Sequence, residues 1–214
     1  CILAIPMACV WMFGRMVGRM RDAAVIFCVM ATLLTVKIAA ANYLESAPSP
    51  AFNGLPVAVT GNLEGKELRL GSTAGATWSV LTTATSNGSV NAMHDSLNPL
   101  TGLVPMVAMW FNITFGGVGV GMINIFLYVI IGVFISGMMV GRTPEYFGRR
   151  VETREMKFAL LAILLHPLLV LGGTALFAAT SWGAATVSAP GFHGFSEILY
   201  EFSSAAANNG SGFE

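Results

Sequence analysis

Charged residues are scarce in this sequence. Aspartate, glutamate, lysine and arginine make up 10% of the 214 residues, and 55% of the residues are hydrophobic, whereas a soluble domain usually carries about 25% charged residues. Residues 97–140 and 159–195 contain none of these four types. Because about 20 apolar residues suffice to span a bilayer, the charge-free stretches predict an all-α integral membrane protein and argue against a soluble fold.

The sequence also lacks the signatures of other classes. Acidic and basic residues balance at 11 each and form no basic block, so the sequence predicts no nucleic acid partner. Cys1, Cys9 and Cys28 all lie in apolar stretches, which gives neither a disulfide framework nor a metal site.

Histidines and glycines offer no further site. His94, His166 and His193 are scattered without metal-ligand spacing, and His166 is expected to be a packed, hydrogen-bonded helix residue. The glycine-rich residues 116–121 lack the lysine and the preceding strand of a phosphate loop. They are interpreted as small residues that allow close helix packing.

Four segments are apolar enough to belong to membrane spans. The first ends near Phe13 and is expected to be the second half of a spanning helix. The others run from about Ala23 to Leu44, from about Val118 to Val140 and from about Lys157 to Thr180. Lys37 lies near the far end of the second span, where its long stem is expected to reach the membrane interface.

Basic residues predict the orientation of these spans. Residues 14–22 and 142–156 are rich in arginine, and short loops of this kind stay in the cytoplasm. Residues 45–73 and 181–193 are then extracytoplasmic. Within the second basic loop, Thr143-Pro144-Glu145 predicts a helix start, with threonine as the N-cap and proline at the first helical position.

Two further apolar segments, Ala74–Ser86 and Glu197–Ala207, are too short to span. Each follows an outer loop and leads into Asn-Gly-Ser. A re-entrant helix that enters from outside and returns as extended chain fits both.

The two segments also indicate an internal repeat. Asn87 and Asn209 begin the two Asn-Gly-Ser sequences, 122 residues apart, and the same offset aligns Trp78 with Tyr200. The expected unit is span, outer loop, short helix, Asn-Gly-Ser, span, an arrangement typical of transport proteins. The predicted divisions are a preceding repeat and loop, one repeat, a cytoplasmic loop and a second repeat cut after its turn, at residues 1–22, 23–141, 142–156 and 157–214.

The repeated turn has the chemistry of a cation site. The C-terminal end of a helix favours a cation, and glycine allows positive φ and close backbone approach. Successive carbonyls can then replace the hydration shell of an ion. Residues 68–94 contain no acidic residue, which fits a monovalent ion better than calcium. The candidate ligands are Thr85, Ser86, Asn87, Gly88, Ser89, Asn208, Asn209, Gly210 and Ser211.

Two other interpretations of these residues stay open. Each Asn-Gly could be an ordinary helix C-cap followed by a turn. His94 and Asp95 with Ser86 or Ser89 could form a membrane-embedded hydrolase, although no Gly-x-Ser-x-Gly elbow surrounds them. The expected role of His94-Asp95 is a polar pair that holds the chain after the turn.

Several motifs resemble one known family. Gly141-Arg-Thr-Pro-Glu-Tyr-Phe-Gly148, followed by Arg149-Arg150, resembles the cytoplasmic loop of the A subunit of Kdp potassium-transporting ATPases (the KdpA family). The same likeness extends to residues 62–71, 82–96, 115–119, 154–157, 193–197 and 203–211.

The resemblance implies four fused copies of a potassium-channel-like span–pore-loop–span unit, of which Ser86–Ser89 and Asn208–Ser211 would be the third and fourth filter segments. It further implies K⁺ as the transported ion, no ATP site on this chain, and a bacterial or archaeal plasma membrane. The implied partners are a P-type ATPase catalytic subunit and small accessory subunits. A passive channel or a Trk/Ktr-type ion-coupled transporter is the nearest alternative, because these share the pore loops but not the 62–71 or 141–148 stretches.

Overall fold

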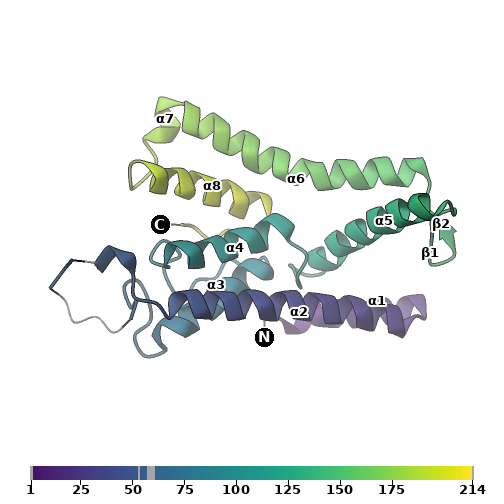
Figure 1. The fold of residues 1–214 in the computed structure, drawn as a ribbon, viewed down its shortest axis with the longest axis horizontal. Helices are drawn as coiled ribbons and strands as arrows, with labels where there is room; N and C mark the ends of the chain where they lie inside the picture. The colour runs from purple at the N-terminus through teal and green to yellow at the C-terminus, as the bar shows by residue number, and fades with distance from the viewer. Residues whose placement is uncertain (1, 53, 57–60, 214) are drawn as a thin grey trace.

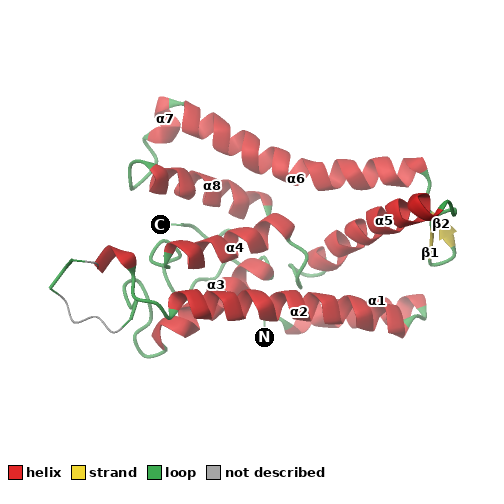
Figure 2. Ribbon diagram, in the orientation of Figure 1, coloured by secondary structure: helices red, strands yellow, loops and turns green. Residues whose placement is uncertain are grey.

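The computed structural model describes residues 2–52, 54–56 and 61–213, and among them the regular secondary structure is helical apart from one short hairpin (Figure 1, Figure 2). In chain order, the elements are α1 (Ala4–Val17), α2 (Met20–Glu45), the 3-10 helix η1 (Pro50–Phe52), α3 (Gly71–Ala84), α4 (Pro99–Phe111), α5 (Val120–Val140), β1 (Glu145–Tyr146), β2 (Arg149–Arg150), α6 (Thr153–Ala179), α7 (Ser181–Ala184) and α8 (Phe192–Ala206).

Within the described residues, three helices, α2, α5 and α6, are long and apolar enough to cross a membrane. Their bounds confirm the three complete predicted spans, except that α6 begins earlier, at Thr153. A capping box sets this start, because the Glu152 and Glu155 side chains each accept a backbone N–H of the first turn. Helix α1 is apolar but has only 14 residues. The chain is therefore a multi-pass, all-α membrane protein, as predicted.

The two arginine-rich loops lie at the same end of the molecule. Figure 1 shows the α1–α2 turn beside the β1–β2 hairpin. The ring of Phe13 lies 5.8 Å from that of Phe147, and the guanidinium of Arg19 lies 5.5 Å from the same ring. The fold thus places on one side the two loops that the charge pattern assigns to one face of the membrane.

The second basic loop is a hairpin and does not contain the predicted helix start. Strand β1 pairs antiparallel with β2, and the two residues between them, Phe147 and Gly148, have φ of 53° and 72°. Two central residues at positive φ are typical of a tight hairpin turn. The prediction that Thr143-Pro144 opens a helix is therefore wrong, since the next helix begins only at Thr153.

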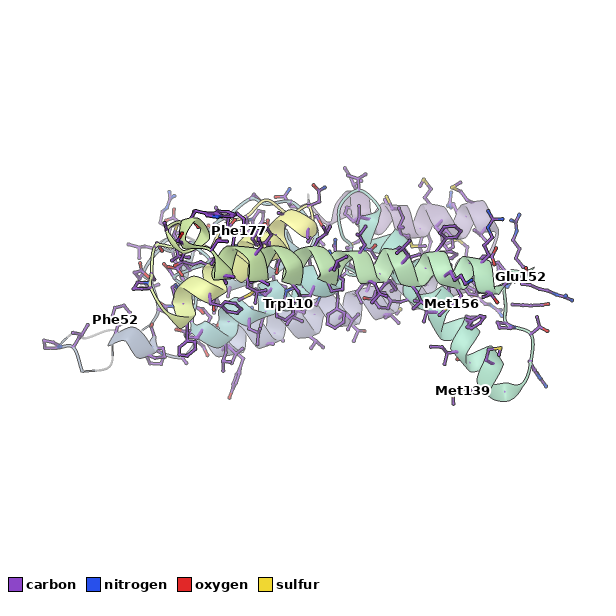
Figure 3. The ribbon with its side chains drawn as sticks, turned by 90° about the horizontal axis from the view of Figure 1, so that it is seen from above. Phe52, Trp110, Met139, Glu152, Met156 and Phe177 are labelled. Carbon is purple, nitrogen blue, oxygen red and sulfur yellow. The ribbon has the colours of Figure 1, made fainter. Side chains whose placement is uncertain are left out.

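The third predicted span is preceded by a helix that the sequence analysis missed. Helix α4 ends at Phe111 and is capped by Asn112, which adopts a left-handed conformation, and α5 begins after Gly119. Gly117 and Gly119 have φ of 48° and 97°, so they form irregular backbone between two helices. The interpretation as helix-packing residues is therefore wrong for Gly117 and Gly119, whereas Gly121 of α5 does pack closely, against the backbone of Gly116. Seen from above, the Met139 end of α5 stands apart from the neighbouring start of α6 at Glu152 (Figure 3).

The short helices α3 and α8 confirm the two predicted non-spanning helices. Both end part-way along the length of α2 and α6 (Figure 1). Helix α3 packs on α2 and α4, and α8 packs on α6 and α4. The Trp110 indole N–H donates to Ser203 Oγ at 2.9 Å and joins α4 to α8. Because α4 contacts both short helices, their C-terminal ends are brought together.

Candidate ion-binding site

Two pore segments, defined as the first (Thr85–Ser89) and the second (Asn208–Ser211), lie in direct contact. The Asn209 amide donates from Nδ2 to the Thr82 carbonyl at 2.8 Å. A β-carbon built on Gly88 would overlap the carbonyl oxygen of Asn209. Backbone atoms of residues more than 120 positions apart are thus in contact, and this contact requires both α3 and α8.

The two pore segments repeat one backbone conformation at the 122-residue offset. Ser86 and Asn208 have φ of 53° and 56°, and Gly88 and Gly210 have φ of 74° and 84°. The Asn87 N–H donates to the Thr82 carbonyl at 3.1 Å, and the Asn209 N–H donates to the matching Ser204 carbonyl at 2.9 Å. Each turn therefore favours the glycine that precedes its serine, Gly88 and Gly210, because positive φ is strained for most other residues.

Side chains repeat in the same way. Asn87 Oδ1 accepts the backbone N–H of Ser89 at 3.2 Å, and Asn209 Oδ1 accepts that of Ser211 at 3.1 Å. In both segments the serine hydroxyl also bonds to the asparagine oxygen. The asparagine side chain thus closes each turn, and the backbone carbonyls are left for other partners.

An aromatic residue of each short helix supports the end of its pore segment. The Trp78 indole N–H donates to the Ser89 carbonyl at 3.1 Å, and the Tyr200 hydroxyl lies 2.9 Å from Ser211 Oγ. Trp78 and Tyr200 are the pair that the 122-residue offset aligned. The aligned positions therefore have matching roles.

Some backbone carbonyls of the pore segments accept a hydrogen bond, and others do not. The Thr85 carbonyl accepts the Gly117 N–H at 2.8 Å, and the Ser89 carbonyl accepts Trp78. Within the described residues, no hydrogen bond reaches the carbonyl oxygens of residues 86–88 or 208–210. Asn87, Asn208 and Gly210 are exposed, whereas Thr85, Asn209 and Ser211 are buried. The carbonyls that accept no hydrogen bond are therefore chemically able to coordinate a cation.

Asn112, which the sequence analysis did not single out, contacts the first pore segment and the residue that precedes the second. Its Oδ1 lies 3.4 Å from Ser86 Oγ, and its Nδ2 donates to the Ala207 carbonyl at 3.4 Å. Its own carbonyl accepts the Asn124 amide at 2.9 Å. An asparagine at the C-terminus of an apolar helix is a capping signal, but its partners 26 and 95 residues away could not be seen in the sequence.

A cavity of about 570 Å³ lies beside Asn112, between α5, α6 and α8, and reaches Asn208 of the second pore segment. Asn124 and His166 add polar groups to an otherwise mainly apolar lining. His166 Nε2 is buried and has no hydrogen-bond partner in the described part of the chain. The expectation that His166 is hydrogen-bonded is therefore not met at this nitrogen.

The Lys37 side chain is bound within the protein. Its Nζ donates to Thr114 Oγ1 at 2.9 Å, and Thr114 is fully buried in the α4–α5 connection. The prediction that the Lys37 side chain extends out to the interface is wrong, because its ammonium group is bound within the protein by the Thr114 hydroxyl.

His94 and Asp95 join the chain after the first pore segment to α8. His94 Nδ1 lies 2.6 Å from the Tyr200 hydroxyl, and Asp95 pairs with His193. Burial lowers the pKa of His94 to about 4, so the imidazole is neutral near pH 7. The partner of His94 is thus a tyrosine, and neither Ser86 nor Ser89 bonds to it among the described residues, which weighs against the hydrolase interpretation.

A possible metal-ligand group lies at the same place. Ligand atoms of Asp95, His193 and Glu197 lie within 4.8 Å of one another. However, the Glu197 carboxylate already accepts the Ser188 N–H at 2.8 Å and the Ser188 hydroxyl at 2.7 Å. These bonds indicate a structural role that holds the α7–α8 connection to α8.

A buried ion pair holds the loop between α2 and α3, the predicted outer loop. Lys66 Nζ lies 2.9 Å from Glu45 Oε1, and both side chains are fully buried. The Asn62 amide and the Asn98 backbone N–H also donate to the Glu45 carboxylate, at 2.8 and 3.0 Å. Next to this pair, the Met93 N–H donates to the Gly65 carbonyl at 2.8 Å. The outer loop is thereby tied to the chain that returns from the first pore segment.

Comparison with known families agrees with this architecture. The family model described as "KdpA: Potassium-transporting ATPase A subunit" matches residues 1–214. The match includes the pore segments, the loop between α2 and α3 and the hairpin between α5 and α6. The chain therefore belongs to the KdpA family, the A subunits of potassium-transporting ATPases.

Proposed function

We propose that the two pore segments bind K⁺ through backbone carbonyls as part of the selectivity filter of the transporter. The observation that carries this proposal is the pair of turns in contact, whose carbonyls at residues 86–88 and 208–210 receive no hydrogen bond within the described chain. Both turns follow the C-terminal ends of α3 and α8, where the helix dipole favours a cation. Carbonyl oxygens can replace the water around K⁺ without an acidic ligand.

The two segments form part of a ring. Residues 23–141 and 157–214 are proposed as the third and fourth repeats, with residues 1–22 and 142–156 as the connecting parts. Two further segments of the same kind, which the family resemblance implies, would complete the ion's coordination. The Thr85 carbonyl accepts the Gly117 N–H, and the carbonyl of Ala207, at the matching position, accepts the Asn112 amide. The ligands that we propose for the first segment are therefore the carbonyls of Ser86, Asn87 and Gly88.

Partners and orientation follow from the same proposal. The loops at 14–22 and 142–156 are cytoplasmic, and the pore segments open to the opposite side of a bacterial or archaeal plasma membrane. A separate P-type ATPase catalytic subunit hydrolyses ATP, and small accessory subunits complete the complex. This chain then selects and binds the ion and carries no ATP site.

The alternatives have less support. A Trk- or Ktr-type transporter would share the pore segments, but the match over residues 1–214 is to the A subunit family of the ATPase. A simple helix cap would not require two turns from different helices to share backbone contact.

Replacement of Gly210 by alanine tests the proposal. Gly210 has φ of 84°, and no described atom lies within 4 Å of an added β-carbon, so the change strains the turn without a clash. Strain of this kind costs about 1–2 kcal/mol, and we expect the K⁺ concentration for half-maximal uptake to rise about tenfold. Uptake would be measured with the full-length chain and its partner subunits, in cells lacking other potassium uptake.

Gly132→Ala is the matched control. Gly132 lies in α5 with open space around it and ordinary helical backbone, so uptake should be unchanged. If Gly210→Ala retained the affinity and the selectivity of the unmodified protein, the turns would be only helix caps.

A further inference from the structure

A buried chain of hydrogen bonds begins at His94 and ends within the second pore segment. The donor and the acceptor of each bond can be assigned by starting from groups that can only donate or only accept. The Asn209 side chain faces the Thr82 carbonyl at 2.8 Å, so that atom must be the amide donor Nδ2. The other atom, Oδ1, is then an acceptor, consistent with the Ser211 N–H that points to it at 3.1 Å.

The donors of the remaining bonds can then be assigned in turn. Ser211 has a single hydroxyl proton, which goes to Asn209 Oδ1 at 2.5 Å. Tyr200 must therefore donate its own proton to Ser211 Oγ at 2.9 Å. The Tyr200 oxygen can then only accept from His94 Nδ1, 2.6 Å away. His94 accordingly carries a proton on Nδ1, and its burial, which lowers its pKa to about 4, keeps the imidazole neutral.

All four side chains are shielded from water. The exposed fractions of His94, Tyr200, Ser211 and Asn209 are 1%, 0%, 3% and 5%. Water cannot readily replace a missing member, so loss of one donor leaves its neighbour unsatisfied. The Tyr200 ring is also fixed by stacking on Phe213, with centroids 4.7 Å apart.

The chain of bonds links the two pore segments from both sides. His94 follows the first segment, and Thr82, the last acceptor, precedes it; Tyr200, Ser211 and Asn209 belong to α8 and the second segment. The first segment has a simpler support, since Trp78 donates directly to the Ser89 carbonyl. The second segment alone has its asparagine oriented by a residue of the other repeat.

From this geometry we infer that His94 is a positioning residue for ion selection, which orients Asn209 and the second pore segment through Tyr200 and Ser211. The inference rests on the proposed function, because it concerns the same ion site. His94 touches no ion. It acts by supplying the proton that sets the direction of every bond after it, and so holds the Asn209 and Gly210 carbonyls in place.

Three variants of the full-length chain, assayed with its partner subunits, test the inference. Tyr200→Phe removes the hydroxyl but keeps the ring on Phe213, and His94→Leu removes the first donor. We expect each to raise the K⁺ concentration for half-maximal uptake about tenfold, the loss of roughly one buried hydrogen bond, and to weaken discrimination against Rb⁺. The maximal rate should be retained. His94→Asn, which can place an N–H near the position of Nδ1, should restore affinity to within about threefold.

The double variant His94→Leu/Tyr200→Phe should be no worse than either single variant, because the chain of bonds is broken only once. Tyr43→Phe is the control, since Tyr43 is 80% exposed, and it should behave as the unmodified protein.

Additive single effects, failure of His94→Asn to restore affinity, or a fall in maximal rate with unchanged affinity would overturn the inference. If Gly210→Ala changes selectivity but the His94 and Tyr200 variants do not, the inference alone fails. If Gly210→Ala also leaves the affinity and the selectivity unchanged, the proposed function fails.

Discussion

Gly88→Ala is expected to reduce the apparent affinity for potassium about 100-fold, the largest effect of any single change in the pore segments. Two costs combine at this position. Gly88 has φ of 74°, where an L side chain is strained, and its β-carbon would overlap the Asn209 carbonyl oxygen. Left-handed strain costs about 1–2 kcal/mol, and overpacking against backbone costs about 1–3 kcal/mol more. A total cost near 3 kcal/mol corresponds to an affinity about 100-fold lower.

The measurement is concentration-dependent K⁺ uptake by the full-length protein with its partner subunits, with Na⁺ and Rb⁺ as competitors. The effect should exceed that of Gly210→Ala, since Gly210 has the same strain but no described neighbour to clash with. Equal effects at the two glycines would show that the contact between the pore segments has no part in ion selection.

The second large effect is expected on stability. Lys66→Met should lower the free energy of unfolding by about 3–5 kcal/mol, because it leaves the Glu45 carboxylate buried without its counter-charge. Both side chains are fully buried, and the two amide donors to Glu45, from Asn62 and Asn98, cannot neutralise it. The outer loop should detach from the chain that follows the first pore segment.

Thermal unfolding of the purified protein in detergent measures this change. Arg69→Met is a matched control, since Arg69 pairs with Glu67 on the exposed surface of the same loop, and such pairs contribute little. Glu45→Gln combined with Lys66→Met should recover part of the loss, because no unpaired charge remains. A Lys66→Met protein as stable as the Arg69→Met protein would contradict the buried pair as the support of this loop.

Sequence patterns were sufficient for elements whose signal is local. The long charge-free stretches predicted α2, α5 and α6, and apolar segments too short to span predicted α3 and α8. Helix α4 was missed because it shares one charge-free stretch with α5, and the break between them depends on backbone conformations at Asn112, Gly117 and Gly119. The hairpin was misjudged because Thr143-Pro144-Glu145 satisfies the rules for a helix start equally well.

The candidate site, too, could be predicted only where its signal is local. The Asn-Gly-Ser turns and their 122-residue repeat were visible in the sequence, since glycine and asparagine mark turns directly. Their long-range partners were not. Gly117 bonds to Thr85, and His94 reaches Tyr200 across 106 residues. Lys37 was misjudged for the same reason, because its partner Thr114 lies 77 residues away. Such contacts depend on how the helices pack, and no local pattern encodes them.

The most direct test of carbonyl-mediated ion binding is to locate the ion. The full-length protein with its partner subunits would be crystallised in Tl⁺, which substitutes for K⁺ and scatters anomalously. We expect anomalous density within coordination distance of the carbonyl oxygens of residues 86–88 and 208–210, and loss of that density when Na⁺ replaces Tl⁺. Density at the cavity beside Asn112 and His166, with none at these carbonyls, would contradict the account.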